Sequence, residues 1–350
     1  MVFYLPFCIQ NNIMSVKEYL KLSRSFNAAL TAVSPVMGAI AMREYDILIL
    51  ILLFIIGFFG HTYGFVLNDI LDYKIDKKSK EISDRPLVSG TISIKNAWIY
   101  AITSMIISFI IAIYLAFTTN NFFPIVVLIL SALFVTIYDI ISKKIPGTDI
   151  ILAISVFFLV LYGSSIVVND IYKVTKLAWI VCILGSIQVF FMNAIVAGMK
   201  DIENDFKEGA KTLAVKMGVR VKDKKLIVPN SFKILAYGVQ LLDLFIVFLP
   251  FFIIWNFYEL SYFQYAQSII IIFIGIILLI ISGKLLNMKY FDRKKVRTFI
   301  GSHYMINFTI VPIMLMNLNP WTIIIIFFPA LGFILSNIVL HGTITQPKTM

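Results

Sequence analysis

Long apolar stretches fill this chain, and short polar segments separate them. The stretches are about twenty residues long, the length at which a helix crosses the hydrocarbon core of a bilayer. Barrel strands alternate in polarity and need only about half that length, so continuous apolar stretches favour helices. The pattern predicts ten membrane-spanning helices, at residues 25–42, 46–68, 97–117, 123–141, 150–168, 177–199, 232–255, 265–286, 298–317 and 321–340.

The composition agrees with a membrane protein. Hydrophobic residues make up 60% of the chain and charged residues 14%, whereas about a quarter of the residues of a soluble domain are charged. Because lipid offers no hydrogen bonds to the backbone, helices are the structure in which such stretches satisfy their own peptide groups. We therefore expect an all-α polytopic membrane protein, a bundle of nine to ten transmembrane helices that forms a single domain over residues 1–350.

Basic residues are distributed unevenly between the two sides of this predicted bundle. Of the 30 Lys and Arg residues, all but Arg43, Lys173 and Lys176 fall on one side. This asymmetry identifies the cytoplasmic side of a membrane protein, so we expect a multi-pass protein of the cell membrane with both termini in the cytoplasm. The net charge of +11 therefore indicates a lipid bilayer and not nucleic acid as the partner, and it leaves the oligomeric state open.

Two acidic clusters lie at ends of predicted spans on the basic side. The first cluster contains Asp69, Asp72 and Asp76, and the second contains Asp201 and Asp205. These spacings place the members of each cluster on one face of a helix. Carboxylates that share a face repel one another unless a cation joins them, and Mg²⁺ favours a few carboxylates together with phosphate oxygens and water. The pattern predicts that the two clusters hold Mg²⁺ and a diphosphate.

Neither a transport function nor a scaffold function explains the acidic residues as well as a site for Mg²⁺ and a diphosphate does. An ion-coupled transporter would place acids near the bilayer midplane and interrupt its helices with Gly or Pro, whereas these acids lie at helix ends. A scaffold protein gives no reason for two matched clusters. Solvated helix-end acids remain the alternative for Asp201 and Asp205, because such pairs are common on helices. The first cluster adjoins an apolar span, where charge is costly, and this favours an enzyme.

The order and spacing of the clusters resemble a known family. The pattern NDxxDxxxD at 68–76, followed by RPLVSG at 85–90, is similar to the first aspartate-rich motif of the UbiA superfamily of intramembrane prenyltransferases, and DxxxD at 201–205 is similar to the second. The resemblance covers about residues 20–315 and implies a helical bundle around a central cavity. Because the family usually has nine membrane helices, residues 320–340 are expected to form an extra one.

The resemblance implies roles for individual residues. Those that would coordinate Mg²⁺ on the diphosphate of a prenyl diphosphate donor are Asn68, Asp69, Asp72, Asp76, Asp201 and Asp205. Those that would be catalytic are Asp69, Asp72, Asp201, Asp205 and Tyr138. Metal ions and cationic side chains stabilise the charge that develops on a diphosphate leaving group, and a dry apolar cavity keeps water away from a carbocation.

Further polar residues would bind the substrates. They are Arg24, Asn27, Asn68, Arg85, Lys143, Lys144, Asn193 and Lys200. Tyr138 with Lys143 and Lys144 is similar to a Tyr and a basic pair of the family, and Arg24 with Asn27 to a pair at the start of its first helix. The alternative for Tyr138 and the lysines is an interfacial tyrosine beside lysines that orient the protein in the membrane.

The resemblance implies Mg²⁺-dependent transfer of an isoprenyl group from a prenyl diphosphate to a nucleophilic, lipophilic or aromatic acceptor at the cytoplasmic face. The segment 201–205 resembles aromatic prenyltransferases of quinone synthesis, whereas Tyr138 and Asp139 with the lysines resemble the archaeal geranylgeranylglyceryl-phosphate type. We expect an aromatic quinone precursor as the acceptor, with geranylgeranylglyceryl phosphate, and hence ether-lipid synthesis, as the alternative.

Overall fold

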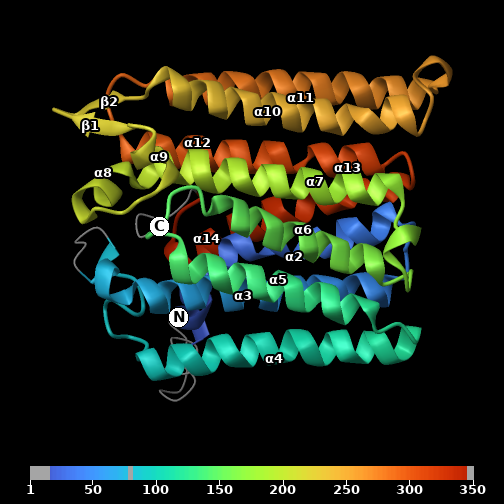
Figure 1. Cartoon of the computed structure of the whole chain (residues 1–350), viewed down its shortest axis with the longest axis horizontal. Coiled ribbons are helices and arrows are strands. Elements are labelled where there is room, and N and C mark those ends of the chain that lie inside the picture. The colour runs from blue at the N-terminus through green and yellow to red at the C-terminus, as the bar shows by residue number, and fades with distance from the viewer. Residues whose placement is uncertain (1–15, 78–81, 345–350) are drawn as a thin grey trace, which may run out of the picture.

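The computed structural model describes residues 16–77 and 82–344, so the ends of the predicted domain 1–350 lie outside the described residues. Its long helices run side by side, nearly antiparallel, from one end of the bundle to the other (Figure 1). They are α2 (Ser25–Ala41), α3 (Ile47–Asp76), α4 (Ile94–Thr119), α5 (Phe123–Ile141), α6 (Asp149–Ser165), α7 (Lys176–Phe190), α10 (Asn230–Ile253), α11 (Tyr262–Leu286), α12 (Arg293–Phe308) and α14 (Phe327–His341).

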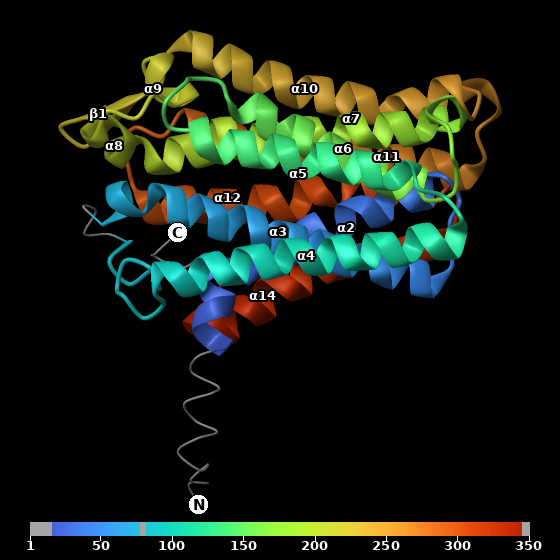
Figure 2. The ribbon, with the colours of Figure 1, turned by 60° about the horizontal axis from the view of Figure 1, so that its bottom comes forward.

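Shorter elements extend or connect these helices. They are the π-helix η3 (Phe191–Ala197) and α8 (Gly198–Glu208) after α7, α13 (Ile310–Leu315) after α12, the 3₁₀-helices η2 (Ile171–Lys173), η4 (Phe257–Glu259) and η5 (Pro320–Ile326), and α9 (Leu213–Lys216). Figure 2 shows α10 and α14 on opposite sides of the bundle, with α2, α3 and α12 between them.

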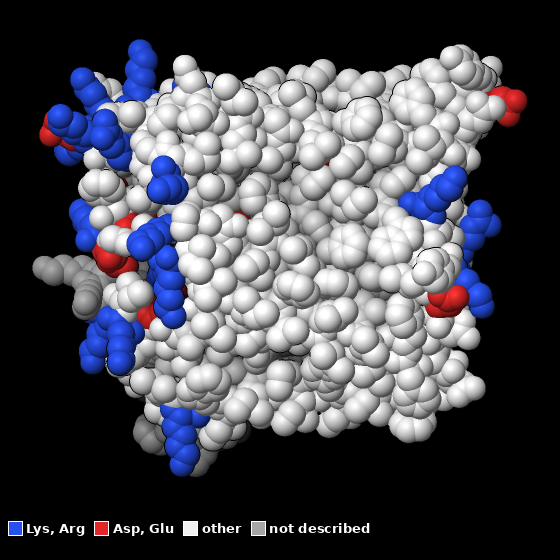
Figure 3. All heavy atoms as spheres, in the orientation of Figure 1, with Lys and Arg blue, Asp and Glu red and all other residues white. Residues whose placement is uncertain are grey.

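The helical, multi-pass character predicted from the sequence is confirmed. Within the described part of the chain, eight helical segments are long and apolar enough to cross a membrane. Two shorter apolar helices, Ser25–Ala41 and Asp149–Ser165, occupy the other two predicted ranges. Lys and Arg gather at the end of the bundle where β1 and α8 lie, and only a few are at the other end (Figures 1 and 3). We call the first of these the basic end.

The structure departs from the predicted boundaries where the acidic clusters begin. The predicted spans 46–68 and 177–199 end where the apolar sequence ends, but the helices continue to Asp76 and Glu208. Both clusters therefore lie on helices that project beyond the apolar stretch. A short antiparallel hairpin of β1 (Arg220–Lys222) and β2 (Lys225–Ile227) also departs from the all-α prediction.

Close backbone contact fixes α2 in the centre of the bundle. A Cβ atom on Gly163 of α6 would lie 1.7 Å from the carbonyl oxygen of Pro35, and one on Gly38 of α2 would lie 2.0 Å from the carbonyl oxygen of Val160. Small residues at such a crossing let two membrane helices approach until their backbones touch. This contact matters for the site, because Arg24 and Asn27 lie at the start of α2.

The contact predicts a specific cost of adding one methyl group. Gly163→Ala should destabilise the fold by about 1–3 kcal/mol, because the new atom overpacks the crossing of α2 and α6. Gly238→Ala is the matched control, since a Cβ atom there meets nothing within 4 Å, and Ala is the better helix former. Thermal denaturation of the purified protein in detergent should show a lower melting temperature for Gly163→Ala alone. Equal melting temperatures for the two variants would contradict the packing account.

Candidate active site

A polar pocket at the basic end and an apolar cavity within the bundle adjoin one another. The polar pocket is lined by carboxylates and cations from α3, α8, α12 and the segments after α3 and α5. The apolar cavity has a volume of about 340 Å³ and is lined mainly by α2, α3, α5, α6, α7 and α12. Six residues line both spaces and so mark their boundary; these are Arg24, Asn68, Tyr138, Asn193, Ala197 and Lys200.

The first acidic cluster is buried at the end of α3 and is paired with cations from other segments. The Asp72 carboxylate lies 2.9 Å from Lys143 Nζ, and the Asp76 carboxylate lies 3.5 Å from the same atom. Arg85 donates a hydrogen bond of 2.6 Å to the other oxygen of Asp76. Both aspartates line the polar pocket. Buried carboxylates need such partners, because desolvation of an isolated charge is expensive.

Asp69 occupies a different place from the other two aspartates of its cluster. It lies deeper along α3, where Arg24 donates a hydrogen bond of 2.6 Å to its carboxylate, and Arg85 lies 3.6 Å away. Asp69 is buried and does not line the polar pocket. Asp69 is therefore placed to hold Arg24 and Arg85 in position and not to contact an ion bound in the polar pocket.

The second acidic cluster lies across the polar pocket on α8. Asp201 accepts a hydrogen bond of 2.9 Å from Arg293 of α12 and lies 3.2 Å from Lys200 Nζ. Asp205 is buried and lines the same pocket as Asp72 and Asp76. The two clusters are therefore brought to one pocket, although about 130 residues separate them along the chain.

The π-helix η3 carries the residue that organises the boundary with the apolar cavity. Asn193 donates hydrogen bonds of 2.6 Å to the Tyr138 hydroxyl and 2.7 Å to Asp149. A π-helix shifts the residues that follow it relative to an α-helical register, and such segments occur often at functional sites. The result is a Tyr138 hydroxyl held at the junction of the polar and apolar spaces.

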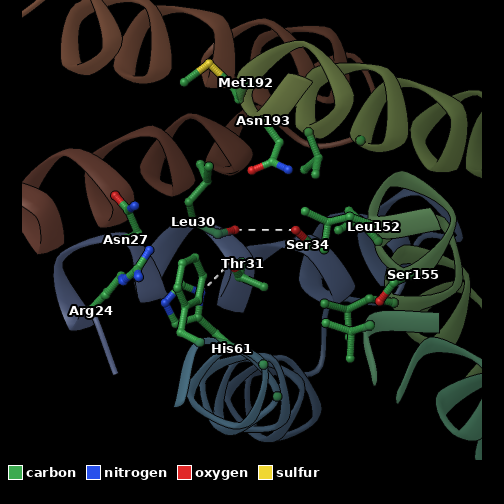
Figure 4. A pocket seen from close by; sticks show the side chains of 18 of the residues that line it. Arg24, Asn27, Leu30, Thr31, Ser34, His61, Leu152, Ser155, Met192 and Asn193 are labelled. Carbon is green, nitrogen blue, oxygen red and sulfur yellow. Dashed lines mark hydrogen bonds between the residues drawn. The ribbon is translucent and has the colours of Figure 1, made fainter. Parts of the chain in front are cut away.

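The first helix supplies the polar residues on the opposite side of the cavity. Figure 4 shows Arg24, the residue before α2, and Asn27 of α2 across the cavity from Asn193. Asn27 lines the apolar cavity, and its backbone carbonyl accepts a hydrogen bond of 3.2 Å from the Tyr304 hydroxyl. Asn68 donates a hydrogen bond of 3.3 Å to Asp139.

Most residues predicted from the sequence line one of these two spaces. Those in the polar pocket are Arg24, Asn68, Asp72, Asp76, Arg85, Tyr138, Lys143, Asn193, Lys200, Asp201 and Asp205. Asp69 and Lys144 are the exceptions. Asp69 is buried beside Arg24 and Arg85, Lys144 is exposed, and neither lines either space. In the turn after α5, Lys143 points back toward the carboxylates of α3, and the next side chain is left in solvent.

Several polar residues of the site are absent from the sequence prediction, and two of them, Arg293 and Asp149, pair with predicted residues. Arg293 pairs with Asp201, but the basic stretch that contains it indicates only the orientation of the protein in the membrane. Asp149 begins α6 on the basic side and accepts the hydrogen bond from Asn193. The position of Asp149 beside an apolar span could have identified it as a site residue. For Arg293, no local pattern in the sequence indicates that it pairs with Asp201.

Two cations of the site, Arg85 and Lys143, remain charged despite their burial. Burial lowers the pKa of Arg85, but the surrounding carboxylates, Asp69 first, outweigh this effect, and the pKa is raised overall. Burial likewise lowers the pKa of Lys143, while Asp72 and Asp76 raise it above its usual range. Both side chains are therefore positive at neutral pH and available to bind an anion.

The donor chemistry of the pocket suits Mg²⁺. Among residues 16–77 and 82–344, no three Asp, Glu, His or Cys side chains already converge as metal ligands; cations hold several of the carboxylates instead. Mg²⁺ does not need a complete protein cage, because it binds through one or two carboxylates, substrate phosphates and water. Carboxylates from both clusters and the Asn68 side chain line one pocket, namely Asn68, Asp72, Asp76, Asp201 and Asp205, so these residues fit an ion that arrives with a diphosphate.

Comparison with known proteins agrees with this geometry. A model of the UbiA prenyltransferase family matches residues 29–268. The digeranylgeranylglyceryl phosphate synthase of Sulfurisphaera tokodaii is 28% identical over 214 residues, which cover 59% of this chain and 72% of the relative. The protein of the same name from Methanobrevibacter smithii is 26% identical over 271 residues, which cover 75% of this chain and 88% of the relative.

Solved structures share the fold. A UbiA homolog from Aeropyrum pernix K1 superposes with a TM-score of 0.64 at 16% identity, covering 82% of this chain and 94% of the other. A UbiA homolog from Archaeoglobus fulgidus bound to GPP and Mg²⁺ gives a TM-score of 0.62 at 17% identity, covering 87% and 99%. The family match spans more than half of the chain and confirms the resemblance of the two aspartate-rich motifs, so this protein belongs to the UbiA prenyltransferase family and is a membrane prenyltransferase.

Proposed function

We propose that this protein transfers a geranylgeranyl group from its diphosphate to the hydroxyl of geranylgeranylglyceryl phosphate and releases diphosphate. The similar synthases of Sulfurisphaera tokodaii and Methanobrevibacter smithii are named for the product of that reaction. They favour the ether-lipid alternative over the aromatic acceptor expected from the segment 201–205. The observation that carries the proposal is the junction of a polar pocket with an apolar cavity, which matches a donor with a diphosphate head and a long apolar tail.

The carboxylates are proposed to hold Mg²⁺ on the donor diphosphate. The proposed ligands are Asn68, Asp72, Asp76, Asp201 and Asp205. Bound Mg²⁺ would neutralise the negative charge that develops on the leaving diphosphate. The homolog bound to GPP and Mg²⁺ supports a prenyl diphosphate that binds together with this ion. We assign Asp69 a positioning role, because it is bound to Arg24 and lies outside the pocket.

Lys143 and Arg85 are proposed to exchange partners when the donor binds. In the structure they neutralise Asp72 and Asp76. Once a divalent ion takes over these carboxylates, the two cations can turn to the diphosphate oxygens, with which they form strong charge-assisted hydrogen bonds.

The bond that breaks is proposed to lie at the boundary between the two spaces. The C1–oxygen bond of the donor breaks, its electron pair leaves with the diphosphate, and positive charge develops on the allylic carbon. The Tyr138 ring, which Asn193 holds at this boundary, can face that charge with its π-electrons. The acceptor hydroxyl oxygen then forms the new C–O bond and gives up its proton to the released diphosphate, while the apolar cavity excludes water from the cation.

We propose that all ten helical segments cross the membrane and that the active site faces the cytoplasm. The observed helices fall in the ten predicted ranges, including the two shorter ones. The polar pocket opens at the basic end, where Lys and Arg gather (Figure 3). Such clusters mark the cytoplasmic side of membrane proteins, where water-soluble diphosphate can also leave.

Reconstituted protein tests the acceptor directly. With Mg²⁺ and geranylgeranyl diphosphate, geranylgeranylglyceryl phosphate should yield the digeranylgeranyl product and diphosphate, as measured by lipid mass spectrometry. Substitution of 4-hydroxybenzoate as the acceptor should yield no prenylated product. Prenylation of the aromatic acceptor alone would restore the quinone-precursor hypothesis. If no diphosphate were released with either acceptor, both hypotheses would be refuted.

Removing one carboxylate from either cluster should abolish most of the activity. Asp72→Asn and Asp205→Asn should each lower kcat/KM by about 100-fold or more, because the charge on the leaving diphosphate loses stabilisation. Glu203→Gln is the matched control; Glu203 lies on α8 within the second acidic segment but does not line the polar pocket. Diphosphate release measures all three variants, and a loss in Glu203→Gln as large as that in Asp205→Asn would argue against the ligand assignment.

Two consecutive lysines should behave differently. Lys143→Met should raise the KM for the donor by about tenfold or more, the cost of a lost hydrogen bond to a charged group. Lys144→Met should leave that KM unchanged, because Lys144 is exposed outside the pocket. Initial rates at varied donor concentration separate the two. A larger effect of Lys144→Met than of Lys143→Met on the KM for the donor would contradict the assignment of Lys143 to the diphosphate.

A further inference from the structure

The last helix, α14, lies along the first helix of the bundle in close contact. A Cβ atom on Gly332 would lie 2.7 Å from the Cβ atom of Ala29 in α2. The next residue, Phe333, packs edge to face against Phe26 of α2, with ring centroids 5.7 Å apart. The helix begins against α3, where the rings of Phe328 and Phe54 lie 6.1 Å apart.

Phe333 also reaches α12 on the other side. Its ring centroid lies 6.4 Å from that of Tyr304. Gly301 faces it as well, since a Cβ atom there would lie 3.8 Å from the Phe333 ring. The side chain, which is only 4% exposed, therefore fills the seam between α2 and α12.

This seam is part of the wall of the apolar cavity. The cavity lining at the seam includes Asn27 and Leu30 from α2 and Gly301 and Tyr304 from α12, and Phe333 lies between the two helices. Among the described residues, Phe333 is the one member of α14 that lines the cavity.

The outer face of α14 is apolar and exposed. Phe328, Leu331 and Leu335 are each more than half exposed, so they contact lipid when the helix lies in a membrane. At the seam, therefore, the ring of Phe333 stands between the cavity and the lipid-facing side of the protein.

We propose that Phe333 is a specificity-determining residue that limits the length of the isoprenoid chain in the cavity. Its ring blocks the path along which a longer chain could leave between α2 and α12 for the bilayer. A smaller side chain would open that path, and a larger one would narrow the cavity. The proposal depends on the binding of a prenyl diphosphate, which is part of the proposed function, and not on which acceptor receives the chain.

Binding of two donors of different length tests the proposal. The probes are the S-thiolodiphosphates of geranylgeraniol and hexaprenol, which resist ionisation, titrated with Mg²⁺ into protein in lipid nanodiscs. The quantity measured is the ratio of the dissociation constant of the hexaprenyl probe to that of the geranylgeranyl probe. Phe333→Ala should lower this ratio by about tenfold, a discrimination typical of small changes in an apolar pocket, and Phe333→Trp should raise it.

Phe328→Ala is the matched control. It removes the same ring from the same helix, but Phe328 is exposed and does not line the cavity, so the ratio should stay at its wild-type value. Phe333→Leu keeps an apolar side chain and should shift the ratio in the same direction as Phe333→Ala, by less, even where Phe333→Ala does not fold. An unchanged ratio in Phe333→Leu and Phe333→Trp, or the same change in Phe328→Ala, would overturn the proposal. The titration uses no acceptor, so failure of the proposed acceptor leaves this test intact.

Discussion

Buried charge at the end of an apolar bundle is the constraint that shapes this protein. A carboxylate taken out of water costs several kcal/mol unless a partner compensates it. The partners of the two buried carboxylates come from other segments, Lys143 for Asp72 and Arg85 for Asp76. Arg293 of α12 pairs in the same way with Asp201, which is 35% exposed. These pairs draw α3, α8, α12 and the segment after α5 around one pocket. Ion pairs of this kind can also be exchanged for a divalent ion and a diphosphate, which is the change that the proposed reaction requires.

The boundary between the polar pocket and the apolar cavity orients the substrate relative to these charged residues. Tyr138, Asn193 and Lys200 line both spaces, so a substrate with a charged head and an apolar tail has one orientation that satisfies both ends. Arg24, which also lies at this boundary, is positioned by the close crossing of α2 with α6. The last helix, α14, completes the lining of the apolar cavity through the ring of Phe333. This ring connects α14 to the proposed reaction, although α14 carries none of the residues of the two aspartate-rich motifs.

The sequence predicted the parts of this site that depend on local pattern. Apolar length located the helices, and helical spacing placed Asp72 with Asp76 and Asp201 with Asp205. It did not predict which cation meets which acid, because such pairs join residues as far apart as Asp201 and Arg293, and hydropathy carries no information on partners. The choice of Lys143 over Lys144 and the position of Phe333 depend in the same way on tertiary packing. The sequence did not predict the ends of the helices at Asp76 and Glu208, because these helices continue beyond the apolar stretch as polar sequence.

The central claim is that the two acidic clusters form one site for one ligand. A double-mutant cycle tests it most directly, with the dissociation constant of geranylgeranyl S-thiolodiphosphate measured in Mg²⁺ for wild type, Asp72→Asn, Asp205→Asn and the double variant. Two clusters that share a ligand should be coupled, with an interaction free energy of about 1 kcal/mol or more. Effects that add to within about 0.5 kcal/mol would show two independent sites and contradict the account.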